Sequence, residues 1–202
     1  KDFEIIVKEG GSQDETLKIA KKFADKVISC KDISAADARN QGAKHAIGDF
    51  LLFVDADTYI PPKVLEKFLE LADNDRVVGG SCRKIPKGGN ILDRLLYEFV
   101  NLSTFICSIF KIGGAHGNCM FVKRSIFNKI GGFNPKIAVA EEQDLVRRAR
   151  KFGKFVFLLG VSVVESPRRI RKWGRLKLYF TWFMGTFRVL LGRWGGNYEK
   201  VR

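Results

Sequence analysis

The sequence predicts an α/β fold, in which a mostly parallel sheet carries helices on both faces and a C-terminal amphipathic helical tail follows. Over the first eighty residues, short apolar runs alternate with longer segments of helical periodicity. Alternation of this kind is typical of parallel sheets built from strand–helix–strand units. Turn-forming residues separate the segments, notably Gly10-Gly11, Gly48 and Pro61-Pro62, which strengthens the assignment.

The first half predicts a regular alternation of elements. Ser34 precedes one helical segment as its N-cap, with Asp37 at the position of a capping-box acid. Gly48 is expected to end that helix, and Pro61-Pro62 to open the next. The expected strands are 5–7, 27–29, 50–54 and 77–82, and the first two expected helices are 15–25 and 34–47. The helix that Pro61-Pro62 opens is expected to carry the apolar face Val64, Leu65, Phe68, Leu69 and Leu71.

The second half changes character. A long, mostly apolar helix is expected over 91–112, followed by a glycine-rich loop over 113–118. Further expected elements are a strand at 119–122, helices at 125–130 and 141–152, and strands at 155–159 and 161–164. No internal repeat or low-complexity linker interrupts the pattern, so residues 1–166 are expected to form one domain.

Composition limits the class of protein. The hydrophobic content of 46% excludes wholesale disorder. The net charge of +14 indicates a polyanionic partner such as nucleotide phosphates, nucleic acid or anionic lipid. The four cysteines have no C-x-x-C spacing, which favours reduced thiols in a cytosolic compartment over a zinc site. No window reaches the roughly 18 uninterrupted apolar residues of a membrane span.

The tail, residues 167–202, holds ten Lys or Arg residues, one acid and eight aromatics. Plotted at helical spacing, its large apolar residues share one stripe: Leu176, Phe180, Phe183, Phe187, Leu191 and Trp194. A basic, aromatic helix of this kind fits a membrane interface. The alternative is a helix docked on its own domain or on another subunit.

The apolar run 50–54 ends in Asp55-Ala56-Asp57, and we expect this run to be a buried central strand. Ligands of open α/β sheets bind beyond the carboxyl ends of strands, and two carboxylates there suit a hard cation. A solvated acidic turn is the alternative. A second acidic cluster opens the helix 141–152 and consists of Glu141, Glu142 and Asp144. These acids are candidates for catalysis, and the alternative is that they only complement the helix dipole.

Four segments in order resemble glycosyltransferase family 2, the inverting nucleotide-sugar transferases with the GT-A fold. Together they cover about residues 3 to 160. The segments are Ile5 to Thr16, similar to V-V-D-x-G-S-x-D-x-T; Ala38-Arg39-Asn40-Gln41-Gly42, similar to A-R-N-x-G; Asp55-Ala56-Asp57, the D-x-D; and Gly131-Gly132-Phe133-Asn134 with Glu141 to Leu145, similar to G-G-F-x and E-D-x-D-L.

The resemblance implies a reaction and a set of roles. Asp57 is expected to bind a divalent cation, Mg²⁺ or Mn²⁺, with Asp55 contacting the ribose or the cation through water. Glu142 is the expected base that deprotonates the acceptor hydroxyl, and an inverting displacement needs only one base. Glu141 and Asp144 are the neighbouring alternatives.

Further residues are assigned by the same resemblance. Glu9 and Asp14 are expected near the base and ribose of the donor nucleotide, although Glu9 also fits a turn acid and Asp14 a helix cap. Arg39 is expected to contact the base or a site carboxylate, and a surface arginine on the helix is the alternative. His116 and Gly117 are expected on the acceptor side. In the tail, the guanidinium groups of Arg168 and Arg169 are expected to bind the phosphate oxygens of the donor diphosphate or, alternatively, lipid headgroups.

Two departures from the family pattern stand out. The family's opening strand, with its P-x-x-N-E turn, has no counterpart here, and we expect the first strand of the fold to be missing. Glu142 stands where the family usually has Asp, which moves the carboxylate one methylene further out.

The expected function is a metal-dependent transfer of a sugar from a UDP- or GDP-sugar to a lipid-linked or glycan acceptor. The basic tail places the enzyme in the cytoplasm, peripheral to or anchored at the cytoplasmic membrane. Alternatives are a sugar-phosphate nucleotidyltransferase, which normally shows an early G-x-G-T-R-like loop that is absent here, and a non-enzymatic module binding nucleic acid or anionic membranes. No nucleic-acid motif accompanies the charge.

Overall fold

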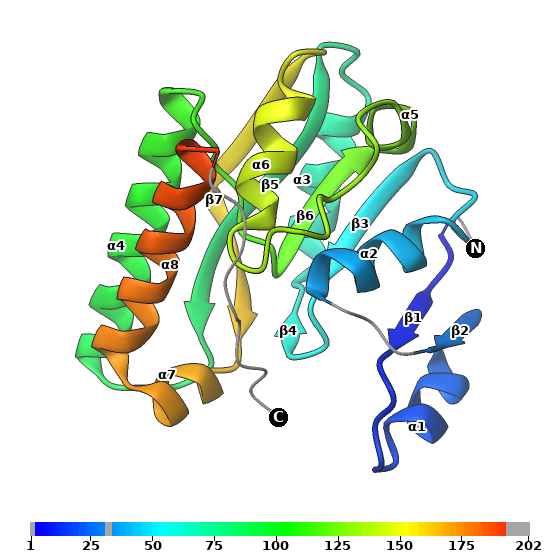
Figure 1. The fold of residues 1–202 in the computed structure, drawn as a ribbon, viewed down its shortest axis with the longest axis horizontal. Helices are drawn as coiled ribbons and strands as arrows, with labels where there is room; N and C mark the ends of the chain where they lie inside the picture. Colours follow the sequence, from blue (N-terminus) through cyan, green and yellow to red (C-terminus); the bar gives the residue numbers. More distant parts are fainter. Residues whose placement is uncertain (1–2, 31–33, 193–202) are drawn as a thin grey trace.

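The computed structural model describes residues 3–30 and 34–192 of the chain (Figure 1). The elements in chain order are β1 (Ile6–Glu9), α1 (Thr16–Phe23), β2 (Lys26–Ser29), α2 (Ala35–Ala43), β3 (Phe50–Val54), β4 (Thr58–Tyr59), α3 (Pro62–Ala72), β5 (Val77–Pro86), α4 (Ile91–Ile109), β6 (Cys119–Lys123), α5 (Arg124–Lys129), α6 (Glu141–Ala149), β7 (Lys154–Glu165), α7 (Arg168–Trp173) and α8 (Arg175–Leu190).

Capping residues start the helices where the sequence predicts, whereas the expectation that Gly48 ends the second helix was wrong, because α2 ends at Ala43. The Ser34 hydroxyl accepts a hydrogen bond from the Asp37 backbone N–H at the start of α2, which satisfies one of the free donors of the first turn. Asn90 and Asp93 form a reciprocal capping box at the start of α4. Pro62 occupies the first turn of α3, where its missing N–H costs nothing.

The larger sheet has five strands in the order β3-β6-β5-β7-β4. The α/β class is confirmed, but the pairing is mixed, because β5–β7 is parallel while β3–β6, β5–β6 and β4–β7 are antiparallel. The cause lies before β6, where Asp55 N donates to Asn118 O at 3.1 Å. Since β6 therefore starts beside the carboxyl end of β3, it must run antiparallel to β3.

The strand β3 lies at the edge of this sheet, and the expectation of a central, buried strand was wrong. Leu51 and Phe53 are buried, whereas Phe50, Leu52 and Val54 are 38–41% exposed. The strands β1 and β2 form a separate parallel pair. Within the described residues no strand pairing joins this pair to β3, so the outer edge of β3 has no strand partner there.

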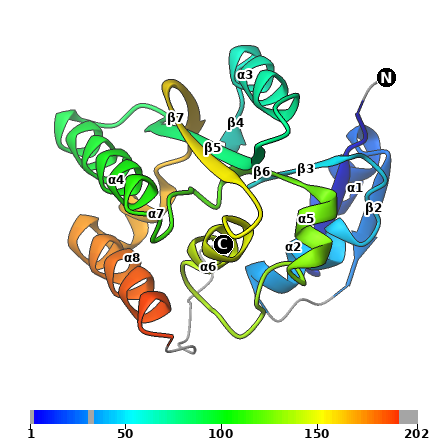
Figure 2. The same ribbon diagram turned by 90° about the horizontal axis from the view of Figure 1, so that it is seen from above.

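Helices cover both faces of the five-stranded sheet, as the sequence predicts (Figure 2). Side chains alternate along each strand, so β6 sends Met120 and Val122 to one layer and Cys119 and Phe121 to the other. The first layer contains buried residues of α2, α5 and α6: Ala36, Phe127, Leu145 and Val146. The second contains those of α3: Val64, Phe68 and Ala72.

The helices α4 and α8 lie side by side at the left of Figure 1. Buried Leu178 packs with Tyr97 of α4 and Ile170 of α7. The first members of the predicted apolar stripe face outward, with Leu176 88% and Phe180 67% exposed, whereas Phe183 and Phe187 of the same stripe line the large cavity. Trp194, the last member of that stripe, lies outside the described residues. No helix in the described part of the chain is both long and apolar enough to cross a membrane.

Candidate active site

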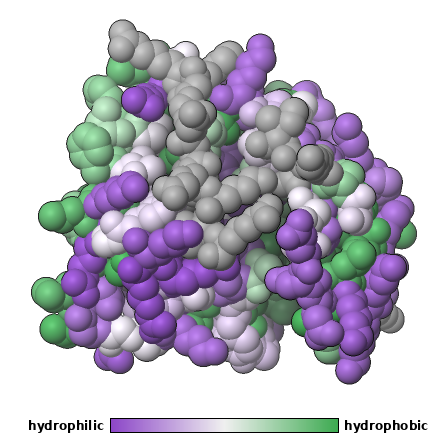
Figure 3. Space-filling view, turned by 60° about the horizontal axis from the view of Figure 1, so that its bottom comes forward, coloured by the Kyte–Doolittle hydropathy of each residue, from purple (hydrophilic) through white to green (hydrophobic). Residues whose placement is uncertain are grey.

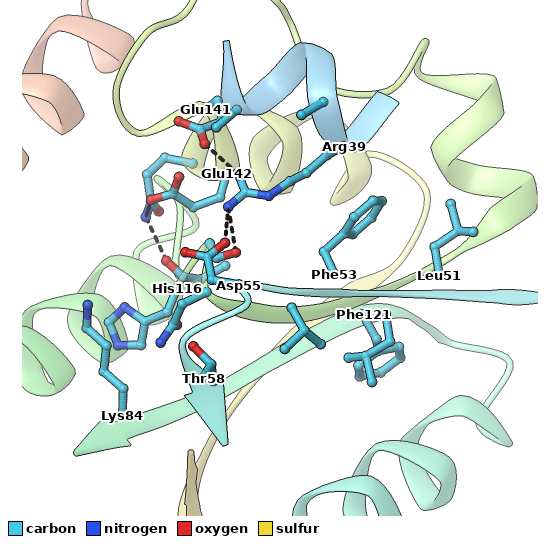
Figure 4. A pocket seen from close by; sticks show the side chains of 18 of the residues that line it. Arg39, Leu51, Phe53, Asp55, Thr58, Lys84, His116, Phe121, Glu141 and Glu142 are labelled. Carbon is cyan, nitrogen blue, oxygen red and sulfur yellow. Dashed lines mark hydrogen bonds and ion pairs between the residues drawn. The ribbon is translucent and has the colours of Figure 1, made fainter. Parts of the chain in front are cut away.

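A large cavity of about 2220 Å³ runs along β3, between β1 and α3, and past the carboxyl end of β3. It brings together segments far apart in the sequence: α2, the D-x-D turn, the glycine-rich loop, the start of α6, and the helices α4, α7 and α8. Most of the predicted site residues line it: Arg39, Asp55, Asp57, His116, Gly117, Glu141, Glu142, Arg168 and Arg169. Figure 4 shows several of these side chains converging from different elements.

Arg39 joins the two acidic clusters (Figure 4). Its guanidinium donates to Glu141 Oε1 at 2.5 Å, to Asp55 Oδ1 at 3.0 Å and to the Gly117 carbonyl at 2.9 Å. Burial disfavours the charge of Arg39, but the carboxylates of Glu141 and Asp55 outweigh burial and raise the pKa of Arg39 above its ordinary value. Arg39 therefore ties the D-x-D turn to the start of α6.

Glu142 sits at the start of α6 and is partly buried. Burial, and next the charge of Glu141, raise the pKa of Glu142 to about 7. A carboxylate with a pKa near the working pH is suited to general-base catalysis. A large fraction of it is ionised at that pH, and its higher pKa makes it a stronger base than an ordinary carboxylate. Its neighbourhood is close-packed: a methyl group at Gly117 would lie 3.3 Å from Glu142 Oε2 and 3.3 Å from Arg39 Nη2.

Gln143 holds this helix start against the glycine-rich loop, a role that sequence reasoning missed. Gln143 Oε1 accepts from the Gly114 N–H at 2.7 Å, and Gln143 Nε2 donates to the Ala115 carbonyl at 2.8 Å. Gly114 has φ +113, and a Cβ there would lie 2.6 Å from the Cβ of Ser108. The loop therefore requires glycine at this position.

Asp57 pairs with an arginine from the other end of the chain. Arg168 Nε lies 2.9 Å from Asp57 Oδ2. The pairing of β4 with β7 brings these residues together, and the Ser166 N–H donates to the Asp57 carbonyl. Arg168 therefore already provides a positive charge beside this carboxylate.

The donor set fits a hard divalent cation. The described residues contain no group of three or more His, Cys, Asp or Glu that would hold a metal by themselves. Magnesium-type ions are usually held by one or two carboxylates together with substrate phosphates, and Asp55 and Asp57 line the same cavity. These two side chains would hold the metal, and the remaining ligands would come from the substrate.

His116 is buried in the cavity wall. Its ring contacts the edge of Phe157, its Nε2 lies 3.1 Å from Asn101 Oδ1, and its backbone N–H donates to Ser81 Oγ. Burial, and next the charge of Lys84, hold the pKa of His116 well below its usual range. The ring is therefore neutral at physiological pH.

Three predicted residues lie apart from the cavity lining. Asp144 is buried and paired with Arg148, whose Nε donates to Asp144 Oδ2 at 2.8 Å, so its carboxylate is engaged within α6 and does not line the cavity. Asp14 accepts from the Thr16 N–H at 3.0 Å, which fits the helix-start alternative.

Glu9 accepts hydrogen bonds from the Ser12 N–H and, at 3.0 Å, from the Ser29 hydroxyl. These bonds, that from the Ser12 backbone above all, lower the pKa of Glu9 to about 2. Glu9 is buried and holds the turn after β1 against β2. The structure therefore gives Glu9 a role within the β1–β2 pair and does not bring its carboxylate into the cavity.

Two further features of the cavity were not predicted. Lys84 and Glu165 form a buried ion pair with Nζ 3.2 Å from Oε2. Among the described side chains, Thr58 Oγ1 and both amide atoms of Asn118 are buried in the lining without a hydrogen-bond partner. Unsatisfied buried polar groups are costly, and here they mark positions where a polar ligand would compensate. Only the fold reveals them, since neither residue type is distinctive in sequence.

Comparison with known proteins decides the family. A family model described as "Glycosyl transferase family 2" matches residues 1–131. The chain belongs to glycosyltransferase family 2. The expected enzyme class is thereby confirmed, and the nucleotidyltransferase and the non-enzymatic binding module are set aside.

Curated relatives of this family 2 chain are similar over most of its length. It is 29% identical to a probable glycosyltransferase, YdaM, of Bacillus subtilis, over 93% of this chain and 49% of the relative. It is 31% identical to a PGL/p-HBAD biosynthesis glycosyltransferase of Mycobacterium tuberculosis, over 71% of this chain and 56% of the relative. The chain thus spans about half the length of the curated relatives it matches.

Solved structures confirm the GT-A fold of this family 2 chain. Staphylococcus aureus TarS 1–349 matches with a TM-score of 0.62 at 17% identity, over 94% of this chain and 55% of TarS. The mannosyltransferase PcManGT of Pyrobaculum calidifontis, in complex with GDP-Man and Mn²⁺, matches with a TM-score of 0.66 at 18% identity, over 94% and 59%.

Proposed function

We propose that this chain carries the catalytic site of an inverting, metal-dependent glycosyltransferase that uses a UDP- or GDP-sugar. The observation that supports it best is the placement of Glu142, with its raised pKa, in one cavity with Asp55 and Asp57. The donor would lie with its diphosphate at the D-x-D turn and its sugar toward Glu142. The complexes of PcManGT with GDP-Man and Mn²⁺ and of TarS with UDP support this choice of donor.

The chain's own residues divide the chemistry. When bound, Mg²⁺ or Mn²⁺ would neutralise charge on the leaving diphosphate. Glu142 takes the proton from the acceptor hydroxyl as that oxygen attacks the anomeric carbon. The bond from the anomeric carbon to the diphosphate oxygen breaks in the same displacement. Arg168 and Arg169 line the same cavity, and their guanidinium forks would bind phosphate oxygens of the donor.

The acceptor is a lipid-linked molecule or a glycan, and the site lies at the cytoplasmic face of a membrane. Exposed Leu176 and Phe180, flanked by Arg175 and Lys177, support contact with an anionic surface. The test is co-sedimentation of the chain with anionic vesicles. Leu176→Ser with Phe180→Ser is expected to weaken it, and unchanged binding would remove this part of the proposal.

The catalytic proposal is tested by hydrolysis of UDP- and GDP-sugars with and without Mn²⁺. Wild type is expected to show metal-dependent hydrolysis, and Asp57→Ala to lose it. The matched control is Asp73→Ala, at the C-terminal end of α3 and outside the cavity lining. Metal-independent hydrolysis that Asp57→Ala leaves unchanged would contradict the proposal.

A further inference from the structure

The cavity continues from the catalytic site into a groove between α4 and α8. The two helices are joined at their N-terminal ends, where Arg175 Nε donates to Asp93 Oδ1 at 2.8 Å and the Tyr179 hydroxyl donates to the Leu96 carbonyl. Beyond this joint each helix presents residues at helical spacing to the cavity. We call this the α4–α8 groove; its walls include Val100, Thr104 and Cys107 from α4, and Trp182, Phe183 and Thr186 from α8.

The groove leads directly to the proposed base. A Cβ at Gly185 would lie 2.5 Å from Val139 Cγ1, so α8 packs closely on the segment that precedes α6. Glu141 and Glu142 follow that segment immediately. Figure 2 shows α6 beside α8 in the view from above. Because Glu142 and the groove walls line one cavity, a molecule in the groove can extend to Glu142.

Polarity changes along this path. Of the described residues that α4 and α8 contribute to the cavity, none is charged. At the junction with the catalytic site the lining becomes ionic, with Lys84 Nζ 3.2 Å from Glu165 Oε2 and 4.2 Å from the centre of the Trp182 ring. The groove is uncharged, with the hydroxyls of Ser103, Thr104 and Thr186 among aromatic and aliphatic side chains, and it ends at buried charges. This combination matches a molecule with a hydrocarbon chain and a polar head.

The outer surface of the same helices is also apolar. Leu95 and Leu102 of α4 are 59% and 55% exposed. In Figure 3, hydrophobic side chains gather along the left edge among hydrophilic ones, on the side where α4 and α8 lie in Figure 1. The groove therefore lies beside a surface suited to lipid.

We propose that the α4–α8 groove binds the hydrocarbon chain of an amphiphilic acceptor whose hydroxyl-bearing head group reaches Glu142. This inference rests on the proposed function and decides between its two acceptor classes in favour of the lipid-linked one. A soluble glycan would leave the apolar walls of the groove without contact.

The test is calorimetric titration of the 202-residue chain with decyl β-D-glucoside, below its critical micelle concentration, and with methyl β-D-glucoside. Each methylene removed from water strengthens binding by about fourfold. We expect the decyl compound to bind at least about a hundredfold more tightly, with a negative heat-capacity change that reports buried apolar surface. Equal affinity for the two glucosides would overturn the proposal.

Groove variants locate the binding. Thr186→Phe and Ser103→Phe put a ring into the groove from opposite walls, and each is expected to weaken decyl glucoside binding at least tenfold. The control is Thr181→Phe, the same change on α8 at a position outside the lining, which is expected to bind as wild type. Equal loss in all three variants would contradict binding in the groove.

Two parallel measurements separate this proposal from its alternatives. Donor hydrolysis needs no acceptor, so it is measured in parallel without glucoside, and the control Thr181→Phe, outside the lining, is expected to hydrolyse the donor sugar as wild type does. Decyl glucoside binding without donor hydrolysis would support the groove as a lipid site and contradict the proposed function. Donor hydrolysis with equal affinity for the decyl and methyl glucosides would support the proposed function and contradict the lipid site. A dimer by sedimentation that Thr186→Phe dissociates, with no glucoside binding, would assign the groove to a second copy of the chain and overturn the proposal.

Discussion

Replacing Arg39 tests whether one side chain holds the two acidic clusters together. In Arg39→Met the apolar stem is kept, and the contacts to Glu141, Asp55 and the Gly117 carbonyl are lost. Removing one partner of a buried ion pair costs about 3–5 kcal/mol. The side chains of Asp55 and Arg39 are 27% and 15% exposed, so water reaches part of the site and we expect about 2–3 kcal/mol.

The assay is thermal unfolding at pH 7.5. For a chain of this size each kcal/mol lowers Tm by about 2–4 °C, so Arg39→Met is expected to lose roughly 4–12 °C. Arg147→Ala is the control, because Arg147 is 41% exposed and lies 3.5 Å from its partner Asp144. An exposed ion pair of this kind contributes less than about 1 kcal/mol to the free energy of unfolding. Equal losses in the two variants would refute the role of Arg39 as the link.

Three further predictions concern the catalytic chemistry. Glu142→Gln is expected to lower kcat about 10²–10⁴-fold while donor binding persists. In wild type, kcat/KM should fall about tenfold per pH unit below about 7, since the protonated carboxyl of Glu142 cannot act as base. A flat pH profile between pH 5 and 7 would count against Glu142 as the base. Gly117→Ala places a methyl 3.3 Å from Glu142 Oε2 and should lower transfer rates at least about tenfold with Tm within about 2 °C of wild type; unchanged rates would show that this contact is unimportant. Asn118→Ala removes an amide that has no partner among the described residues, so unfolding by urea should be unchanged while donor or acceptor affinity falls in titrations; a large loss of stability would mean that its role is structural.

Local chemistry allowed much of the fold to be predicted. Ser34 with Asp37 marked a helix start because the hydroxyl satisfies a backbone donor three residues away. The alternation of strands and helices gave the α/β class with helices on both faces. Such features depend on neighbours in sequence, which the sequence itself displays.

Features that depend on distant residues were missed or placed wrongly. The run Phe50–Val54 is apolar enough for a central strand, yet its position at an edge follows from which strands pair with it. Asp144 could not be told from Glu142 by residue type, because Arg148 Nε, which binds it, is revealed only by the orientation of α6. Lys84 and Glu165 are separated by β6 and α4 to α6 in sequence and meet only because β5 and β7 pair in parallel.

The central claim is that Asp55 and Asp57 hold the diphosphate of a nucleotide sugar through a divalent cation, while Glu142 acts on the acceptor. Titration of UDP and GDP into the chain, with and without Mn²⁺, tests it most directly. At least one nucleotide is expected to bind in a Mn²⁺-dependent manner to wild type and to Glu142→Gln, and to lose at least about tenfold in affinity in Asp57→Ala. Binding that is independent of Mn²⁺ and equal in all three proteins would contradict the account.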